Sequence, residues 1–187
     1  MPLSPPAPRQ PWHTRKLTFE GFKRDDGLWD VEGELIDTKP REISTTERGL
    51  LPAHTPLHHM RARITFDDDL TVARIEASME STPFPECPGS LHNLQKLVGV
   101  RASNGWRHAI QDAMGRTEGC THMRELLVNL ATVAYQTRSG RKRVSPDGAL
   151  QPITAPLPHM GQCTGWDFDG EVMKRHYPQF HGWRKPG

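Results

Sequence analysis

The feature that most constrains this chain is a strict alternation of apolar and polar residues on both sides of a short acidic run. Every second residue from His58 to Phe66 would share one face of an extended chain, and residues 71–79 repeat the pattern. A period of two is that of a β-strand with one buried face. Asp67-Asp68-Asp69 between the two stretches is typical of a turn. The sequence therefore predicts an antiparallel hairpin over residues 58–79, with His58 facing the core.

A second hairpin is predicted nearer the N-terminus, and helices are predicted toward the C-terminus. Residues 28–37 also alternate, and the turn chemistry of Arg24-Asp25-Asp26-Gly27 makes residues 15–22 the expected partner strand. The apolar spacing then becomes helical in three segments, 91–98, 106–113 and 123–135. Strands followed by helices indicate an α+β fold, in which an antiparallel sheet of the two hairpins is packed by C-terminal helices.

The length of 187 residues suits one domain of ordinary size. We expect a single α+β domain over residues 13–180. Residues 1–12, with five prolines, predict a disordered arm, and residues 139–158 predict a loop or flap that begins basic and becomes rich in proline and glycine. Residues 181–187 are expected to be a tail.

Composition excludes several classes of protein. No apolar run approaches the ~20 residues of a membrane span, and no basic start with an apolar stretch indicates a secretory signal. A net charge of +2 with mixed signs gives no case for nucleic acid as a partner. Three cysteines cannot all pair within one chain, so we expect free thiols or metal ligands in a reducing cytoplasm.

Cys120-Thr121-His122 is the most suggestive local feature, because it lies where the longest predicted helix begins. Unpaired backbone N–H groups and the helix dipole stabilise a thiolate there, which is the form that binds metal or attacks carbon. The alternative interpretation is a small buried cysteine at a helix cap beside a surface histidine. Both interpretations stay open at this stage.

The four candidate ligands come from three separate segments of the chain. Together, two thiols and two imidazoles would suit tetrahedral zinc or an iron–sulfur cluster. A buried imidazole needs partners for its ring nitrogens, so a hydrogen-bonded core histidine is the alternative for the inward-facing one. The candidate metal ligands are His58, Cys87, Cys120 and His122, and Cys163 is a spare candidate or a buried anchor.

The candidates for acid–base chemistry are glutamates. Glu125 lies one turn into the long helix, where it could cap the helix or support a ligand. Glu32 and Glu34 fall on the polar face of their strand and are expected to be solvated. The chain has no Gly-rich phosphate loop, no Gly-x-Ser-x-Gly elbow and no His-Glu-x-x-His helix, which disfavours nucleotide enzymes, α/β hydrolases and zinc proteases.

Several motifs stand out along the chain: Arg24–Gly33, Asp37-Thr38-Lys39, Pro56-Leu57-His58, Gly119–His122 with Glu125-Leu126-Leu127, and Cys163 with Tyr177-Pro178. Together they resemble the bacterial domain of unknown function numbered 2889. The resemblance covers most of the chain from His13 to Phe180, and in that family an Asp often stands where this chain has His59. The family carries no settled activity, but its resemblance implies a context of aromatic or acyl-CoA catabolism.

A second resemblance concerns architecture. A hairpin, a cysteine, helices and then a Cys/His pair at the start of a long helix are similar to the iron–sulfur cluster scaffold proteins. Cys87 would match the first ligand of those proteins, and Cys120 with His122 would match the last pair. The middle scaffold cysteine has no counterpart between Cys87 and Cys120.

Three functional hypotheses follow. The first is a small cytoplasmic catabolic enzyme that holds zinc or iron beside Cys120 and acts on an aromatic or acyl intermediate, with Glu125 or His59 moving a proton. The second is a non-catalytic metal or iron–sulfur carrier with a protein partner. The third is a structural domain with inert thiols.

Overall fold

The computed structural model describes residues 2–103, 105–139, 149 and 152–184. Its contacts divide the chain into two compact units, Met1–Gly140 and Arg141–Gly187, whereas the sequence suggested one domain over residues 13–180. Most of the predicted loop at 139–158 lies outside the described residues. The two units are therefore described separately.

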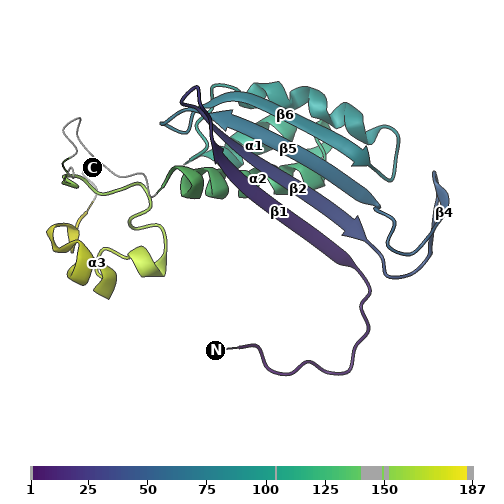
Figure 1. Cartoon of the computed structure of the whole chain (residues 1–187), viewed down its shortest axis with the longest axis horizontal. Helices are drawn as coiled ribbons and strands as arrows, with labels where there is room; N and C mark the ends of the chain where they lie inside the picture. Colours follow the sequence, from purple (N-terminus) through teal and green to yellow (C-terminus); the bar gives the residue numbers. More distant parts are fainter. Residues whose placement is uncertain (1, 104, 140–148, 150–151, 185–187) are drawn as a thin grey trace. The chain divides into compact units, whose positions relative to one another are not determined.

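The first unit is built on a four-stranded antiparallel sheet in the order β1-β2-β5-β6 (Figure 1). The two predicted hairpins and the α+β class are confirmed. A small two-stranded sheet, β3 (Ile43–Thr45) with β4 (Gly49–Leu51), lies within the connection from β2 to β5. The four long strands are β1 (Thr14–Lys23), β2 (Trp29–Thr38), β5 (His58–Phe66) and β6 (Val72–Ser81).

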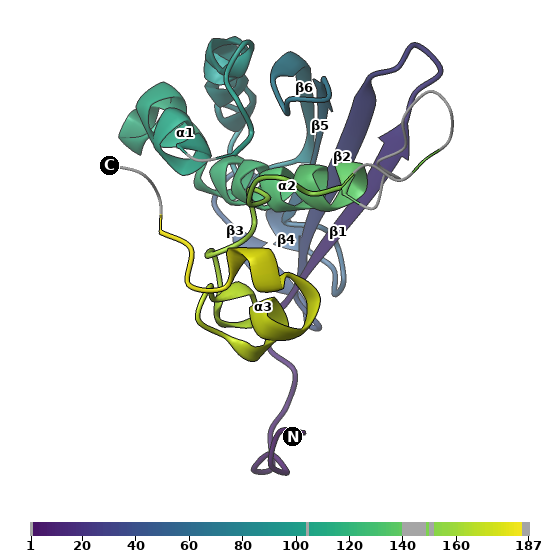
Figure 2. The ribbon, with the colours of Figure 1, turned by 90° about the vertical axis from the view of Figure 1, so that its left-hand side faces the viewer.

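Helices cover the apolar face of this sheet (Figure 2). In β2 the odd-numbered residues are buried and the even-numbered residues are partly exposed, as the alternation in the sequence requires. Leu126, Leu127 and Leu130 of the longest helix are fully buried in the same core. The helices of this unit are η1 (Cys87–Leu97, of 3-10 type), α1 (Trp106–Met114), the 3-10 turn η2 (Arg116–Glu118) and α2 (Thr121–Arg138).

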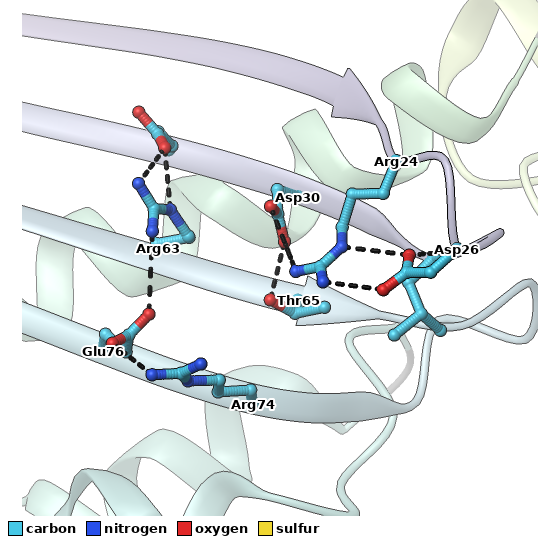
Figure 3. Close-up of polar contacts among 9 residues, drawn as sticks. Arg24, Asp26, Asp30, Arg63, Thr65, Arg74 and Glu76 are labelled. Carbon is cyan, nitrogen blue, oxygen red and sulfur yellow. Dashed lines mark hydrogen bonds and ion pairs between the residues drawn. The ribbon is translucent and has the colours of Figure 1, made fainter.

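The opposite face of the sheet carries a ladder of charged side chains. Figure 3 shows Arg63 of β5 reaching Glu76 of β6, which in turn contacts Arg74. Arg63 also bonds Glu32 of β2 on its other side, at 2.7 Å from Nε to Oε1. Glu32 thus lies on a solvated sheet face, as its strand position predicts.

The second unit has its own small core. Met160, Met173 and Phe180 are buried in it, and several aromatic side chains pack around them. Trp183 is one of these, so the segment expected to be a tail contributes to the core at that position. The unit contains η3 (Thr164–Trp166), α3 (Glu171–His176) and η4 (Pro178–Phe180).

Residues 2–12 precede the sheet without forming a helix or a strand, and their side chains are exposed. At the end of this segment the Arg41 guanidinium lies over the Trp12 ring, 3.4 Å from its centroid. In the part of the chain that the structure describes, no helix combines the length and apolar character that crossing a membrane requires.

The packing of α2 on β1 depends on Gly21 of β1, which lies against the Thr137 side chain of α2. A Cβ atom at Gly21 would lie 2.7 Å from the Thr137 Cβ, so Gly21→Ala forces strand and helix apart. We expect this change to lower the free energy of unfolding by about 1–3 kcal/mol, as overpacking does, in chemical denaturation. At Gly89 an added Cβ meets nothing within 4 Å, so Gly89→Ala is the matched control. Equal stabilities of the two variants would contradict the packing.

Candidate metal centre

The candidate site starts from one row of residues across three neighbouring strands. The register places Arg15 of β1 opposite Asp37 of β2, and Asp37 opposite His58 of β5. All three belong to the helix-facing side, because Asp37 follows the buried alternation of β2. A slip of one residue would move the row to the solvated face, so strand register determines this site.

Asp37 is a buried carboxylate, with 1% of the residue exposed. Arg15 binds it in bidentate fashion: Nε donates to Oδ1 at 2.8 Å, and Nη2 donates to Oδ2 at 2.8 Å. His13 Nε2 lies 3.2 Å from Oδ1. Burial by itself raises the pKa of Asp37, but the hydrogen bonds and charge of Arg15, with His58 and His13, outweigh it and leave that pKa below the ordinary value. Asp37 is therefore ionised in the folded protein.

Two imidazoles meet the same oxygen of this carboxylate. His58 Nδ1 lies 3.0 Å from Asp37 Oδ2, and His122 Nε2, from the first turn of α2, lies 3.9 Å from it. The two rings are neighbours, with centroids 3.9 Å apart. Burial lowers the pKa of His58, and the nearby His122 lowers it further. Burial and the charge of Arg15 lower the pKa of His122. Both rings are thus favoured in the neutral form.

Asp37, His58 and His122 each offer one ligand atom, and these atoms lie within 4.8 Å of one another. Neutral imidazole and ionised carboxylate are the protonation states in which these side chains bind transition metals. The hydrogen bonds from Arg15 to Asp37 resemble the outer contacts that hold a ligating carboxylate in place. The arrangement is therefore a candidate metal centre of two histidines and one carboxylate.

The thiols are not members of this group. Cys120 occupies the N-cap position of α2 without a capping hydrogen bond from its side chain, and its Sγ lies 3.8 Å from His122 Nδ1, whereas Nε2 is the nitrogen 3.9 Å from Asp37. Cys87 is the first residue of η1 and is partly buried. Cys163 is exposed and belongs to the second unit. Of the four ligands expected from the sequence, the described residues bring together His58 and His122, with Cys120 beside one of them.

The two acid–base candidates lie in different places. Glu125 reaches the site through Arg15, because Nη1 of that arginine bonds Glu125 Oε2 at 2.5 Å. His59 points to the other side of the sheet from His58, as alternation in a strand requires. There its Nε2 lies 2.8 Å from Glu34, and its Nδ1 lies 2.9 Å from Glu80. His59 is thus part of the charged ladder, while Glu125 borders the candidate centre.

Asp37 is the residue that sequence reasoning missed. Asp37 falls on the same alternate positions of the strand as Trp29, Val31 and Leu35, and this spacing already places its carboxylate on the buried face. A buried charge needs partners, so the position of Asp37 on the buried face indicates a polar cluster at the end of β2. His13 and Arg15, just before and within β1, carry no comparable signal.

The lowered histidine pKa values give the unfolding equilibrium a defined pH dependence. Below the ordinary value of 6.5, the unfolded chain takes up protons at His58 and His122 more readily than the folded chain. In EDTA, the free energy of unfolding is therefore expected to fall as the pH drops from 6.5 toward the lower pKa values of the folded protein. Asp37 affects a lower range, because its pKa is depressed from 3.8.

We expect the double change His58→Gln with His122→Gln to flatten this slope in denaturant titrations at several pH values. His108→Gln, on an exposed part of α1, is the matched control and should keep the slope of the wild type. An unchanged slope in the double variant would contradict the assignment of buried neutral rings.

Comparison with known proteins agrees with the resemblance noted from the motifs. Neither the curated proteins nor the solved structures gave a match, so the similarity to iron–sulfur scaffold proteins is not shown. A family model described as "Protein of unknown function (DUF2889)" matches residues 13–136, which is more than half of the chain and includes Asp37, His58 and His122. The chain therefore belongs to this family of proteins of unknown function, DUF2889.

Proposed function

We propose that the first unit is a metal-dependent enzyme whose divalent transition metal is bound by Asp37, His58 and His122. The observation that carries this proposal is the convergence of three ligand atoms of suitable chemistry within 4.8 Å at the end of the sheet. The ligands come from β2, β5 and α2, so the folded core itself holds them in place. Ligands on regular elements are more rigid than ligands on loops.

The number of ligands favours catalysis over a structural role. Structural zinc sites are closed by four protein ligands, whereas catalytic sites have three and keep a position for water or substrate. Two histidines and one carboxylate suit zinc, and they also form the set used by non-haem iron(II) enzymes. The partial exposure of His122, whose side chain is 25% accessible, leaves an approach from solvent.

The substrate in this proposal is a small molecule with a carbonyl or phenolate oxygen. A bound divalent ion polarises such an oxygen or activates a water molecule. Arg15 keeps Asp37 ionised and oriented, and Glu125, which is partly exposed and bonded to Arg15, is the acidic group that would move a proton. An aromatic or acyl intermediate would fit this chemistry. Three free cysteines suit the reducing cytoplasm as the compartment.

Metal affinity tests the proposal directly. Titration of the purified, chelator-treated full chain with Co²⁺, followed by its d–d absorption, is expected to show one site per chain, and Zn²⁺ should displace the signal. His122→Ala is expected to raise the dissociation constant at least about tenfold, because even an outer-contact change costs 10–100-fold.

His59→Ala is the matched control, since this neighbouring histidine faces the other side of the sheet and should leave metal affinity unchanged. Cys120→Ala should leave it within about twofold of the wild type, because Cys120 is not a member of the ligand group. Stoichiometric binding that survives His122→Ala, or the absence of binding in the wild type, would overturn the proposal.

One observation favours a second candidate function, thiol chemistry at Cys120. Cys120 Sγ lies 3.8 Å from His122 Nδ1, and Asp37 Oδ2 lies 3.9 Å from the other nitrogen of the same ring. A nucleophilic thiol, an imidazole base and a carboxylate that orients the base, lined up in this order in space, form the arrangement that activates cysteine nucleophiles. Cys120 also directly precedes the first residue of α2, so the ordered helix holds it next to His122.

Alkylation rates distinguish this candidate. Under the thiol hypothesis, iodoacetamide should label Cys120 about tenfold faster in the wild type than in His122→Gln, because the base is removed. The exposed Cys163 provides an internal control, and its labelling rate should be the same in both proteins. His58→Ala should abolish metal binding but leave the labelling of Cys120 unchanged. Equal Cys120 rates with and without His122, measured by peptide mass spectrometry, would eliminate the thiol candidate.

A further inference from the structure

The sheet ends on one side at a long strand with no neighbour. β1 pairs with β2 along its ten residues, and among the described residues no other strand pairs with it. Such an edge presents unpaired backbone N–H and C=O groups that a further strand can use. Apolar side chains are also exposed along it: Leu17 is 37% exposed and Phe22 is 44% exposed, whereas Leu35, opposite Leu17 in β2, is fully buried.

The sequence of β1 is complementary to itself in one antiparallel register. With a two-fold axis through Thr18, Lys16 is opposite Glu20 of a second copy, and the same pair recurs on the other side of the axis. Leu17 is opposite Phe19 in the same way. Lys16 and Glu20 are opposite Ile36 and Glu32, which are partly exposed in β2, so the charged pair lies on the solvated face. Leu17 and Phe19 are opposite Leu35 and Gly33, which are buried, so the apolar pair lies on the helix-facing side.

Neighbouring registers lose this match. A shift of two residues in either direction places Lys16 opposite Phe22 or opposite Thr18, and it separates Leu17 from Phe19. Within the described residues neither Lys16 nor Glu20 forms an ion pair inside its own chain, so both charges are available to a second copy. Directly opposed pairs of opposite charge, and pairs of an aromatic with an aliphatic side chain, stabilise antiparallel strands.

From this complementarity we infer that two copies of the chain pair through β1, in the register that places Lys16 opposite Glu20, to form one continuous eight-stranded antiparallel sheet. The two-fold axis makes the interface isologous, so each chain contributes both members of each pair. The pairing covers the exposed Leu17 with Phe19 of the second copy. It also closes the edge of the strand that carries Arg15, the residue that holds Asp37.

Charge exchange tests both the dimer and its register. Light scattering on the full chain is expected to give twice the chain mass of 21.1 kDa. Lys16→Glu places two carboxylates opposite each other, and Glu20→Lys does the same with two ammonium groups. Each change is expected to raise the dimer dissociation constant about tenfold or more, because two favourable pairs become repulsive.

Mixing the Lys16→Glu and Glu20→Lys chains should restore a dimer, since opposite charges then meet at both positions. The double variant, with both changes in one chain, should dimerise alone. Lys23→Glu lies on the same strand outside the proposed pairs and is the control, which should remain dimeric.

Zero-length carbodiimide cross-linking of mixed ¹⁴N and ¹⁵N wild-type chains gives an independent readout that needs no variant. The expected product is a Lys16–Glu20 cross-link of mixed isotopic mass. A monomeric wild type at 100 µM, or a dimer whose dissociation constant is unaffected by both single charge reversals, would overturn the inference. Neither outcome bears on metal binding, because Lys16 and Glu20 contribute no ligand atom to the candidate centre.

Discussion

The ion pair between Arg15 and the buried Asp37 is the interaction on which the candidate site depends. A buried carboxylate without a partner is strongly destabilising, and the bidentate guanidinium supplies that partner from the neighbouring strand. The same arginine reaches Glu125, so one side chain connects β1, β2 and the first turns of α2. The Arg15 guanidinium therefore links the pairing of β1 with β2 to the packing of α2.

This charge also controls the chemistry around it. Asp37 stays ionised because Arg15 lies beside it, while burial keeps His58 and His122 in the neutral form. In the proposed function, a divalent metal bound by this anionic oxygen and the two neutral imidazoles would satisfy all three groups at once. On the opposite face of the sheet, Glu32 and Glu76 are both paired with Arg63, and Figure 3 shows the contact of Arg63 with Glu76. Among the described residues, the helix-facing end of the sheet is the place where two histidines and a carboxylate come within ligand distance of one another.

The fold was largely predictable because its pattern is local. Alternation over 58–66 and 71–79 needs only neighbouring residues to be read, and both hairpins formed as expected. Convergence of distant side chains needs the register between hairpins, which no local pattern encodes. His58 and His122 do meet, but their carboxylate partner is Asp37, and Cys87 is not a member of the group. The soft-ligand chemistry of the thiols favoured them as metal ligands, whereas the position of Asp37 among the buried residues of β2 was the stronger indication of the site.

The most direct measurement of the central claim is anomalous diffraction from crystals of the full chain grown with Zn²⁺. The account predicts one strong peak at about 2.0–2.2 Å from a ring nitrogen of His58, a ring nitrogen of His122 and an oxygen of Asp37. A peak bound only by other residues, or no peak while the three side chains keep their hydrogen bonds, would contradict it.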